Sequence, residues 1–559
     1  MHNKILSGEI MDKIRKPTIW TGALVGVCLT AALIAVFYLV QQLVGTVFVP
    51  FDVFDWVGRV APGGLVRFGI ETIVQIITTL KIGNLDSAAK TAEQTLAISG
   101  MFVTGVLVSA ILYGILPRIK TSQVPLAGLV AGLVVGVPVM LISATVDVNS
   151  TQSELINAIW ILLGFMVWGL MLGWVYNRLT VTKVSAAPES ASVEVIDRRQ
   201  FLIRLGATTA AITVVGAGLG AILRRSSAPA NEVAVANTAS GTPALQPWSA
   251  THKLPNDGDP IIPAPGTRPE LTPVGQHYRI DINTIPPRIS ESEWKLSVTG
   301  LVDKPFEMTL AELKSKYQPI DEFVTLACIS NPLAGELTST TRWTGVKLKD
   351  FVADMHLKPN ATHLKITSAD NFDEFVDIET INKDERVMLA YEWDGLPLAV
   401  DHGFPLRVYI PNHYGMKQPK WITTIEAVDG WQEGWWVRRG WDKDAIMEAT
   451  SVIDTVAVND TVTKDDKKLI PIGGIAHAGS RGISKVELKI DDNDWVEAQL
   501  RKPISDVTWV IWRYDWPYAQ GSHTFTVRCT DGEGALQKEV NQGPGPGGAT
   551  GWHRVGQSV

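Results

Sequence analysis

Cysteine is scarce in this chain of 559 residues, which contains only Cys28, Cys328 and Cys529. Three cysteines are too few for a disulfide scaffold or an iron–sulfur protein. Of ten histidines only His2 precedes residue 252, so the apolar helices before that point cannot supply the paired axial ligands of a membrane b-type haem. The net charge of -7 comes without a long basic block, which argues against a nucleic-acid partner.

Long apolar stretches, in contrast, are abundant before residue 225. Five are long enough to cross a bilayer, which takes about 20 helical residues, and they cover residues 18–40, 95–116, 124–146, 155–177 and 201–223. The basic residues that flank them predict a cytoplasmic N-terminus and a last span that ends outside; they are Lys13, Arg15, Lys16, Arg118, Lys120, Arg178, Lys183, Arg198 and Arg199. Residues 65–80 are apolar too but include Arg67, Glu71 and Gln75. We interpret them as an interfacial or re-entrant helix on the outer side.

The five predicted spans contain no acidic residue that would mark a proton path. This favours an anchor or docking platform over a transporter. The last span follows Arg198-Arg199-Gln200-Phe201-Leu202, which resembles the twin-arginine signal for export of folded proteins. The alternative is a pair of ordinary positive-inside arginines. No cleavage site follows, so the helix is expected to remain as an anchor.

The composition predicts a helical membrane domain at 1–223 and an exposed linker rich in Ala, Pro, Ser and Thr at 224–270. A soluble α+β domain is expected at 271–444. From 445 to 559 the pattern is all-β, since segments 484–490, 507–513 and 523–529 alternate apolar and polar residues between turns. This spacing is typical of a β-sandwich.

The same alternation separates the three cysteines. Cys529 shares a strand face with Phe525 and Val527, which predicts a small core residue, and Cys28 lies inside the first span. Cys328 ends the apolar run of 324–331, VTLACISN, where a strand would lead into a loop. A lone thiol there is compatible with buried packing, a nucleophile or a metal ligand.

The surroundings of Cys328 resemble the cofactor loop of the sulfite oxidase family of molybdenum enzymes. The stretch 325–346, TLACISNPLAGELTSTTRWTGV, has that family's single cysteine in a TLxCxxN setting and the W-x-G-V turn after it. The resemblance continues through LAYE at 389–392, GLPL at 395–398, DHGFPLR at 401–407 and Lys420-Trp421. It covers about residues 270–559, and it implies that the sandwich is an immunoglobulin-like dimerisation domain.

The resemblance implies a site for molybdenum–molybdopterin. Cys328 would ligate the metal, for which a soft thiolate is suited, and Tyr391 would line the substrate face. The alternatives are a packed aromatic for Tyr391 and a turn-stabilising histidine for His402. The residues implied to hold the pterin and its phosphate are Tyr278, Arg279, Asn331, Ser368, His402, Arg407, Lys417, Gln418 and Lys420.

One departure concerns the residues after Asn331, which are Pro332-Leu333-Ala334 where sulfite oxidases have basic residues. Arg342 is a candidate to replace them. The resemblance therefore predicts a membrane-anchored, extracytoplasmic oxidoreductase that transfers an oxygen atom in either direction, as sulfite oxidases or sulfoxide reductases do. No haem is expected, so a separate cytochrome or quinone-linked partner would exchange electrons, and a homodimer is possible. The alternative function is a non-catalytic, membrane-tethered binding or assembly protein.

Overall fold

The computed structural model describes residues 16–80, 83–180, 198–226 and 245–559. Lys13, Arg15, Lys183 and residues 227–244 of the predicted linker lie outside these residues. The chain forms two compact units. The first consists of residues 1–60 and 92–228, and the second of residues 61–91 and 229–559. Residues 61–91 therefore pack with the C-terminal half, although the sequence placed them among the membrane segments.

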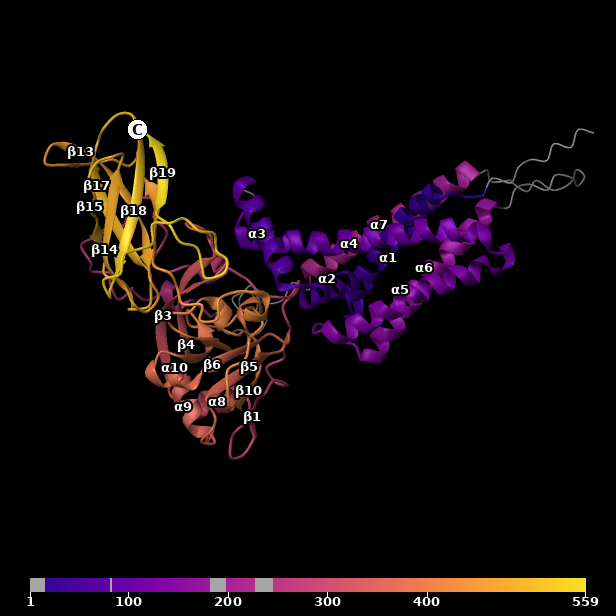
Figure 1. The fold of residues 1–559 in the computed structure, drawn as a ribbon, viewed down its shortest axis with the longest axis horizontal. Helices are drawn as coiled ribbons and strands as arrows, with labels where there is room; N and C mark the ends of the chain where they lie inside the picture. The colour runs from indigo at the N-terminus through magenta and orange to yellow at the C-terminus, as the bar shows by residue number, and fades with distance from the viewer. Residues whose placement is uncertain (1–15, 81–82, 181–197, 227–244) are drawn as a thin grey trace, which may run out of the picture. The chain divides into compact units, whose positions relative to one another are not determined.

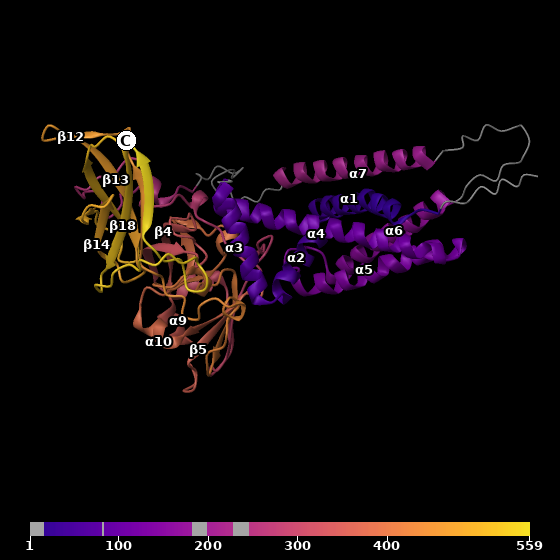
Figure 2. The ribbon, with the colours of Figure 1, turned by 45° about the horizontal axis from the view of Figure 1, so that its top comes forward.

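The first unit is helical, and its long helices run alongside one another (Figure 2). Gly128, Gly132 and Gly169 let α5 and α6 approach closely, because a Cβ at any of them would lie within 2.3 Å of a backbone oxygen of the other helix. Six helices of the described residues are long and apolar enough to cross a membrane, the five predicted spans and α3. The helices of the chain up to the linker are α1 (Ile19–Val44), α2 (Val49–Val60), α3 (Gly63–Leu80), α4 (Leu85–Ile115), α5 (Val124–Val146), α6 (Glu154–Thr180) and α7 (Arg198–Ser226).

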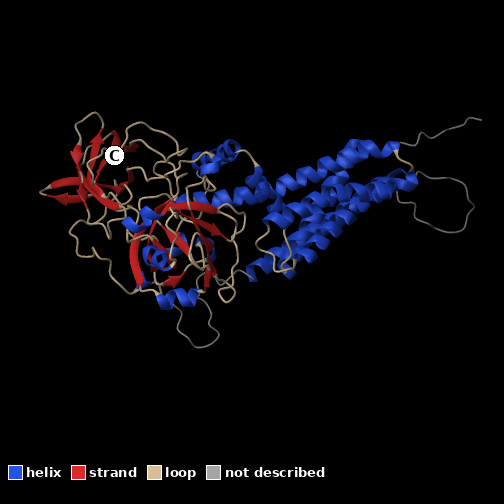
Figure 3. Cartoon of the chain, turned by 60° about the horizontal axis from the view of Figure 1, so that its bottom comes forward, coloured by secondary structure: helices blue, strands red, loops and turns tan. Residues whose placement is uncertain are grey.

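The second unit contains the strands (Figure 3). Its first sheet has the order β2-β1-β10-β5-β6, with β1 and β10 parallel. The second sheet has the order β3-β4-β7-β8, with β9 added beside β7. The bounds in chain order are β1 (Leu296–Gly300), β2 (Phe306–Met308), α8 (Leu310–Lys316), β3 (Pro319–Ala327), β4 (Thr338–Lys347), α9 (Leu348–Asp354), β5 (His363–Ser368), β6 (Asp373–Asp377), α10 (Ile378–Lys383), β7 (Met388–Trp393), β8 (Leu396–Pro397), β9 (Arg407–Tyr409) and β10 (Ile422–Val428).

The last part of the chain forms two further sheets, β11-β13-β17-β16 with β12 beside β13, and β15-β14-β18-β19 (Figure 1). Ile472 of the first and Phe525 of the second are fully buried in one shared core. Cys529 is 1% exposed in this core, which confirms its prediction as a packing residue. The strands are β11 (Thr450–Val456), β12 (Val462–Lys464), β13 (Lys467–His477), β14 (Ile483–Ile490), β15 (Val496–Glu497), β16 (Gln499–Leu500), β17 (Val510–Pro517), β18 (Ser522–Asp531) and β19 (His553–Ser558).

Candidate cofactor site

Cys328 follows directly on the last residue of β3 and begins a ten-residue loop to β4. Its backbone N–H donates to the carbonyl of Leu337 (2.9 Å), and its Sγ lies 3.0 Å from the hydroxyl of Ser330. Burial raises the pKa of the Cys328 thiol, while the Ser330 hydroxyl and the charge of Lys420 act in the opposite direction. A bound metal cation would favour the thiolate more strongly than either.

Asn331 holds the Cys328 loop in shape. Its Oδ1 accepts the backbone N–H of Leu337 at 2.9 Å, and its own N–H donates to the carbonyl of Cys328 at 3.0 Å. Gly335 has to be small here, since a Cβ would lie 2.4 Å from Oδ1 of Asn331. The amide therefore fixes the loop that carries the thiol.

Arg407 lies in the second sheet at the start of β9, buried to 3% exposure. Its Nη1 donates to the carbonyl of His402 (2.9 Å), and its guanidinium lies 4.5 Å from the centre of the Trp343 ring. Burial lowers the pKa of Arg407 to about 10, so the side chain is still a cation at neutral pH. Gly403 makes room for this geometry, because it has φ +111 and a Cβ there would lie 3.1 Å from that of Arg407.

Two buried histidines lie beside Arg407. The rings of His277 and His402 are 5.2 Å apart, and the His402 ring is 4.5 Å from that of Trp393. Burial lowers the pKa of His277 to about 3 and that of His402 well below its usual value. Both are therefore neutral at physiological pH, and Nε2 of His277, which has no partner among the described residues, can donate or accept one hydrogen bond.

A second group of charges surrounds Asp281, whose side chain is 1% exposed. Its carboxylate lies 2.8 Å from Nε of Arg279 and 3.5 Å from Nζ of Lys420. Lys420 also donates to the carbonyl of Asp401 at 2.9 Å. Burial lowers the pKa of Lys420 to about 8, an effect that Asp281 opposes and the neighbouring Arg407 and Arg279 reinforce.

Several buried polar atoms near these residues have no hydrogen-bond partner among residues 16–80, 83–180, 198–226 and 245–559. They are Nε of Arg407, Nε2 of His277 and Oγ of Ser368, on residues that are 2% to 4% exposed. Buried polar groups are normally satisfied, and unpaired ones indicate a missing group. A molybdopterin, with a polar ring edge and a phosphate, would supply acceptors and an anion, so these residues fit the implied cofactor.

Three of the predicted residues have other contacts. Tyr391 packs in the core between the first two sheets, with Nζ of Lys314 4.4 Å from its ring centre, and not in the cluster that contains Cys328. Lys417 is buried against Glu374, with Nζ 2.6 Å from Oε1. Gln418 donates to the carbonyls of Ile410 and His413.

Tyrosines do lie near Cys328, but they are different ones. Tyr278 packs in the same buried cluster as Cys328. Burial raises the pKa of Tyr278 well above its usual value, and the nearby Cys328 adds to the effect. Tyr414 is another, with its pKa raised to about 12 by burial and by Glu448 and Cys328. The resemblance pointed to Tyr278 and Arg279 in the sequence, but neither Tyr414 nor His277 was predicted.

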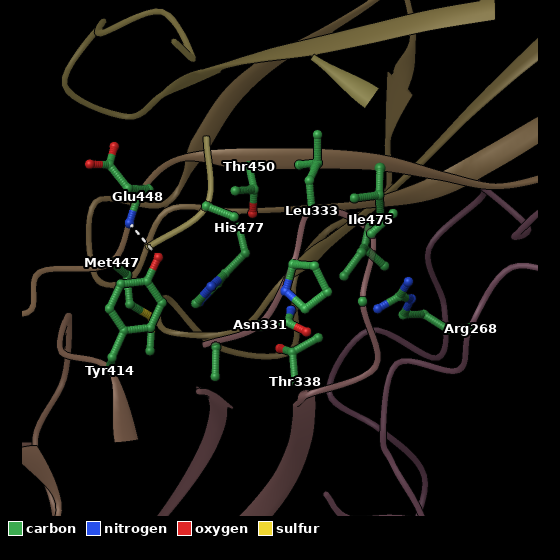
Figure 4. A pocket seen from close by; sticks show the side chains of 16 residues that line it. Arg268, Asn331, Leu333, Thr338, Tyr414, Met447, Glu448, Thr450, Ile475 and His477 are labelled. Atoms are coloured by element: carbon green, nitrogen blue, oxygen red, sulfur yellow. Dashed lines mark hydrogen bonds between the residues drawn. The ribbon is translucent and has the colours of Figure 1, made fainter. Parts of the chain in front are cut away.

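A small cavity lies beside the Cys328 loop (Figure 4). It has a volume of about 50 Å³ and is lined by Ala327 and Asn331, on either side of Cys328 in the sequence. His477 and Arg268 line it from β13 and from the segment before β1. Arg342 does not line it, since its guanidinium pairs with Asp321 (2.7 Å). Arg268 is therefore the arginine at this cavity.

The site defines a class of protein, an oxidoreductase with a molybdopterin-binding domain. Residues 283–436 match the family described as oxidoreductase molybdopterin binding domain. This match, together with the relatives below, supports a molybdopterin-dependent oxidoreductase similar to the sulfite oxidase family. Among the described residues no three His, Cys, Asp or Glu side chains gather as a metal-binding group.

Relatives include nitrate reductase [NAD(P)H] of Hordeum vulgare, 25% identical over 310 residues, which are 45% of this chain and 34% of the relative. Sulfite oxidase of Arabidopsis thaliana is 23% identical over 276 residues, which cover 41% of this chain and 70% of the relative. The chain thus spans about a third of that nitrate reductase. Among solved structures, the sulfane dehydrogenase SoxCD of Paracoccus pantotrophus aligns with a TM-score of 0.43 and 19% identity, over 54% of this chain and 86% of that one.

Proposed function

We propose that this protein is a membrane-anchored, extracytoplasmic molybdenum–pterin oxidoreductase that catalyses two-electron oxygen-atom transfer on a small substrate. The observation that carries the proposal is that the buried thiol of Cys328 and the buried guanidinium of Arg407 lie near the same tyrosine, Tyr278, while Nε of Arg407 has no partner among the described residues. A binding protein that had lost the cofactor would have no need to keep these costly groups. This argues against the alternative of a non-catalytic tethered protein.

The residues have different proposed roles, which follow from their positions. The cofactor, when bound, supplies a metal that exchanges an oxygen atom and two electrons with the substrate. Cys328 would be its protein ligand, and Arg407, His402, His277, Ser368, Arg279 and Lys420 would hold the pterin and its phosphate. Burial of Cys328 excludes water from the thiolate, and the Asn331 loop fixes its direction.

The cavity at the loop supports a small and uncharged substrate. With about 50 Å³ it has room for roughly four water-sized groups. Its arginine is neutralised, because Nη2 of Arg268 lies 2.7 Å from the carboxylate of Asp454, and Glu448 pairs with Lys538. His477 adds no charge, since burial lowers its pKa to about 4. A sulfoxide or similar neutral oxygen donor suits such a cavity better than a sulfite dianion does.

The orientation follows from the number of crossings. Arg67, near the start of α3, donates to the carbonyl of Gly440 at 3.1 Å, and Ile77, near its end, packs in the cluster that contains Cys328. An 18-residue helix is about 27 Å long, so a spanning α3 could touch a soluble domain at one end only. Five crossings, by α1, α4, α5, α6 and α7, would put the catalytic domain on the side opposite the N-terminus. The flanking basic residues, such as Lys16 and Arg118, support a cytoplasmic N-terminal side.

The sandwich of β11 to β19 would be the immunoglobulin-like domain, and the arginine pair at the start of α7 would direct export of the loaded, folded enzyme. Electrons would pass to or from a separate partner. Because the family resemblance implies a dimerisation domain, we expect two copies of the chain to pair through this sandwich.

The decisive experiment is the molybdenum and pterin content of the purified full chain beside a Cys328→Ser variant. The expected result is one molybdenum and one pterin per wild-type chain, with the metal signal altered or lost in the variant. Wild-type protein without either, from cells able to make the cofactor, would contradict the proposal. Sulfoxides should then be reduced faster than sulfite is oxidised, and the opposite order would refute the assignment of a neutral substrate.

A further inference from the structure

Residues 61–91 lie between two helices of the membrane half in the sequence but pack in the catalytic unit. Ile77 at the end of α3 and Leu85 at the start of α4 are each 6% exposed. Both belong to the buried cluster of Cys328 and Tyr278. An anchor would need no contact with the core around the metal ligand, so this segment has a second role.

The polar contacts of the segment are directed at the cofactor residues. Lys90 in α4 is buried at 7% exposure, and its Nζ lies 3.2 Å from Oδ1 of Asp281. The same ammonium donates to the carbonyls of Asp281 (2.9 Å) and Asn283 (3.0 Å). One turn earlier, Oδ2 of Asp86 accepts the backbone N–H of Arg279 at 3.0 Å.

Asp281 links Lys90 to the predicted pterin residues. Its carboxylate binds Arg279 and Lys420 as well as Lys90. Burial acts to raise the pKa of Asp281, but the three cations outweigh it and hold the pKa well below its usual value. The group is therefore ionised, and removing one cation would leave a buried carboxylate that pulls harder on the other two.

We infer that Lys90 is a positioning residue of the cofactor site, which acts through Asp281 to fix Arg279 and Lys420 where they meet the pterin. The inference rests on the proposed function and extends it, because it makes residues 61–91 a working part of the oxidoreductase. Without Lys90, Arg279 and Lys420 are drawn toward the carboxylate and present less charge to an anionic ligand. Retention of the cofactor is then the property that changes most.

The test uses the full chain in detergent with three substitutions. Lys90→Met removes the charge and keeps the length of the side chain, Lys90→Arg restores a cation, and Lys347→Met removes a half-buried lysine that pairs with Glu385. Bound molybdenum and pterin are measured per chain, and the rate of pterin release after dilution is followed by fluorescence. Lys90→Met should release pterin about 10- to 100-fold faster, as outer partners of ligand sites do when removed. Lys90→Arg should recover most of the retention, and Lys347→Met should behave as wild type.

A double-mutant cycle separates positioning from simple stability. In an Asp281→Asn background, Lys90→Met should have little further effect on release, because the group that it acts through is already gone. Equal release rates in Lys90→Met and wild type would overturn the inference, as would a thermal destabilisation with unchanged retention. Lys90→Gln takes the place of the methionine variant if the latter does not accumulate. A wild type without cofactor would refute the proposed function, whereas a loaded wild type with a fully retaining Lys90→Met variant would refute the role of Lys90 alone.

Discussion

The guanidinium of Arg407 lies 4.5 Å from the centre of the Trp343 ring, with both side chains buried. A planar cation can stack on an aromatic face and still donate along its edge, and Nη1 does so to the carbonyl of His402. This leaves Nε without a partner in the part of the chain that the structure describes. On the proposed function, the pair presents a fixed donor to the pterin.

Replacing Arg407 with lysine should lower cofactor retention at least about tenfold, since an ammonium cannot stack and donate in the same fork geometry. Pterin fluorescence after denaturation measures the loss, and circular dichroism checks the fold. Arg386→Lys, at a half-buried pair with Asp384, is the matched control. Equal pterin content in Arg407→Lys and wild type would show that the guanidinium does not contact the cofactor.

Asn331→Ala should destabilise the Cys328 loop. The substitution removes the acceptor of the Leu337 N–H, which costs about 1 kcal/mol. Thermal unfolding should shift down by a few degrees, and Asn331→Asp, which keeps an acceptor, should lose less. A larger loss in Asn331→Asp than in Asn331→Ala would contradict this role for the amide.

Tyr391→Phe should leave cofactor content unchanged and turnover within about twofold of wild type, a change too small to indicate a lost transition-state contact. The reason is that Tyr391 packs away from the Cys328 cluster. Steady-state kinetics with the best substrate measures this, beside Tyr414→Phe, which should change the rate more. A loss of a hundredfold or more in Tyr391→Phe would place the hydroxyl at the substrate after all.

His477 should make the protein sensitive to acid. Burial holds its folded-state pKa at about 4, below the unfolded value of about 6.5. Between these values only the unfolded state binds the proton, so the stabilising effect is complete above pH 6.5 and is lost as the pH falls toward 4. The loss approaches about 1.4 kcal/mol per pH unit. Melting temperatures at pH 7 and pH 5 should differ less for His477→Gln than for wild type, while His252→Gln, an exposed control, should show the wild-type difference.

The sequence was informative where function depends on local pattern. The alternation of residues 523–529 predicted the burial of Cys529, which the structure confirms. The end of an apolar run predicted that Cys328 begins a loop, and it does so one residue after β3. The start of α8 also depends on a local pattern, since Thr309 and Glu312 cap it by exchanging hydrogen bonds with each other's backbone N–H groups.

The sequence failed where contacts join distant residues. Tyr391 has no partner residue in the pairing of β4 with β7, because Thr344 pairs with Glu392 and the next residue, Gly345, pairs with Ala390. Such a β-bulge cannot be recognised from the sequence around Tyr391. Lys417 is neutralised by Glu374, 43 residues away. Arg268 lines the cavity, although it belongs to residues 224–270, which the sequence predicted to be an exposed linker. The spacing of residues along the sequence does not reveal any of these contacts.

The link between Lys90 and Asp281 spans 191 residues of chain. During synthesis, Lys90 therefore leaves the ribosome long before its carboxylate partner, and α5, α6 and α7 are made in between. The catalytic domain cannot complete its charge cluster from its own continuous sequence, because one of the cations comes from the start of α4. On the proposed role of Lys90, a catalytic domain without this contact would hold its cofactor loosely.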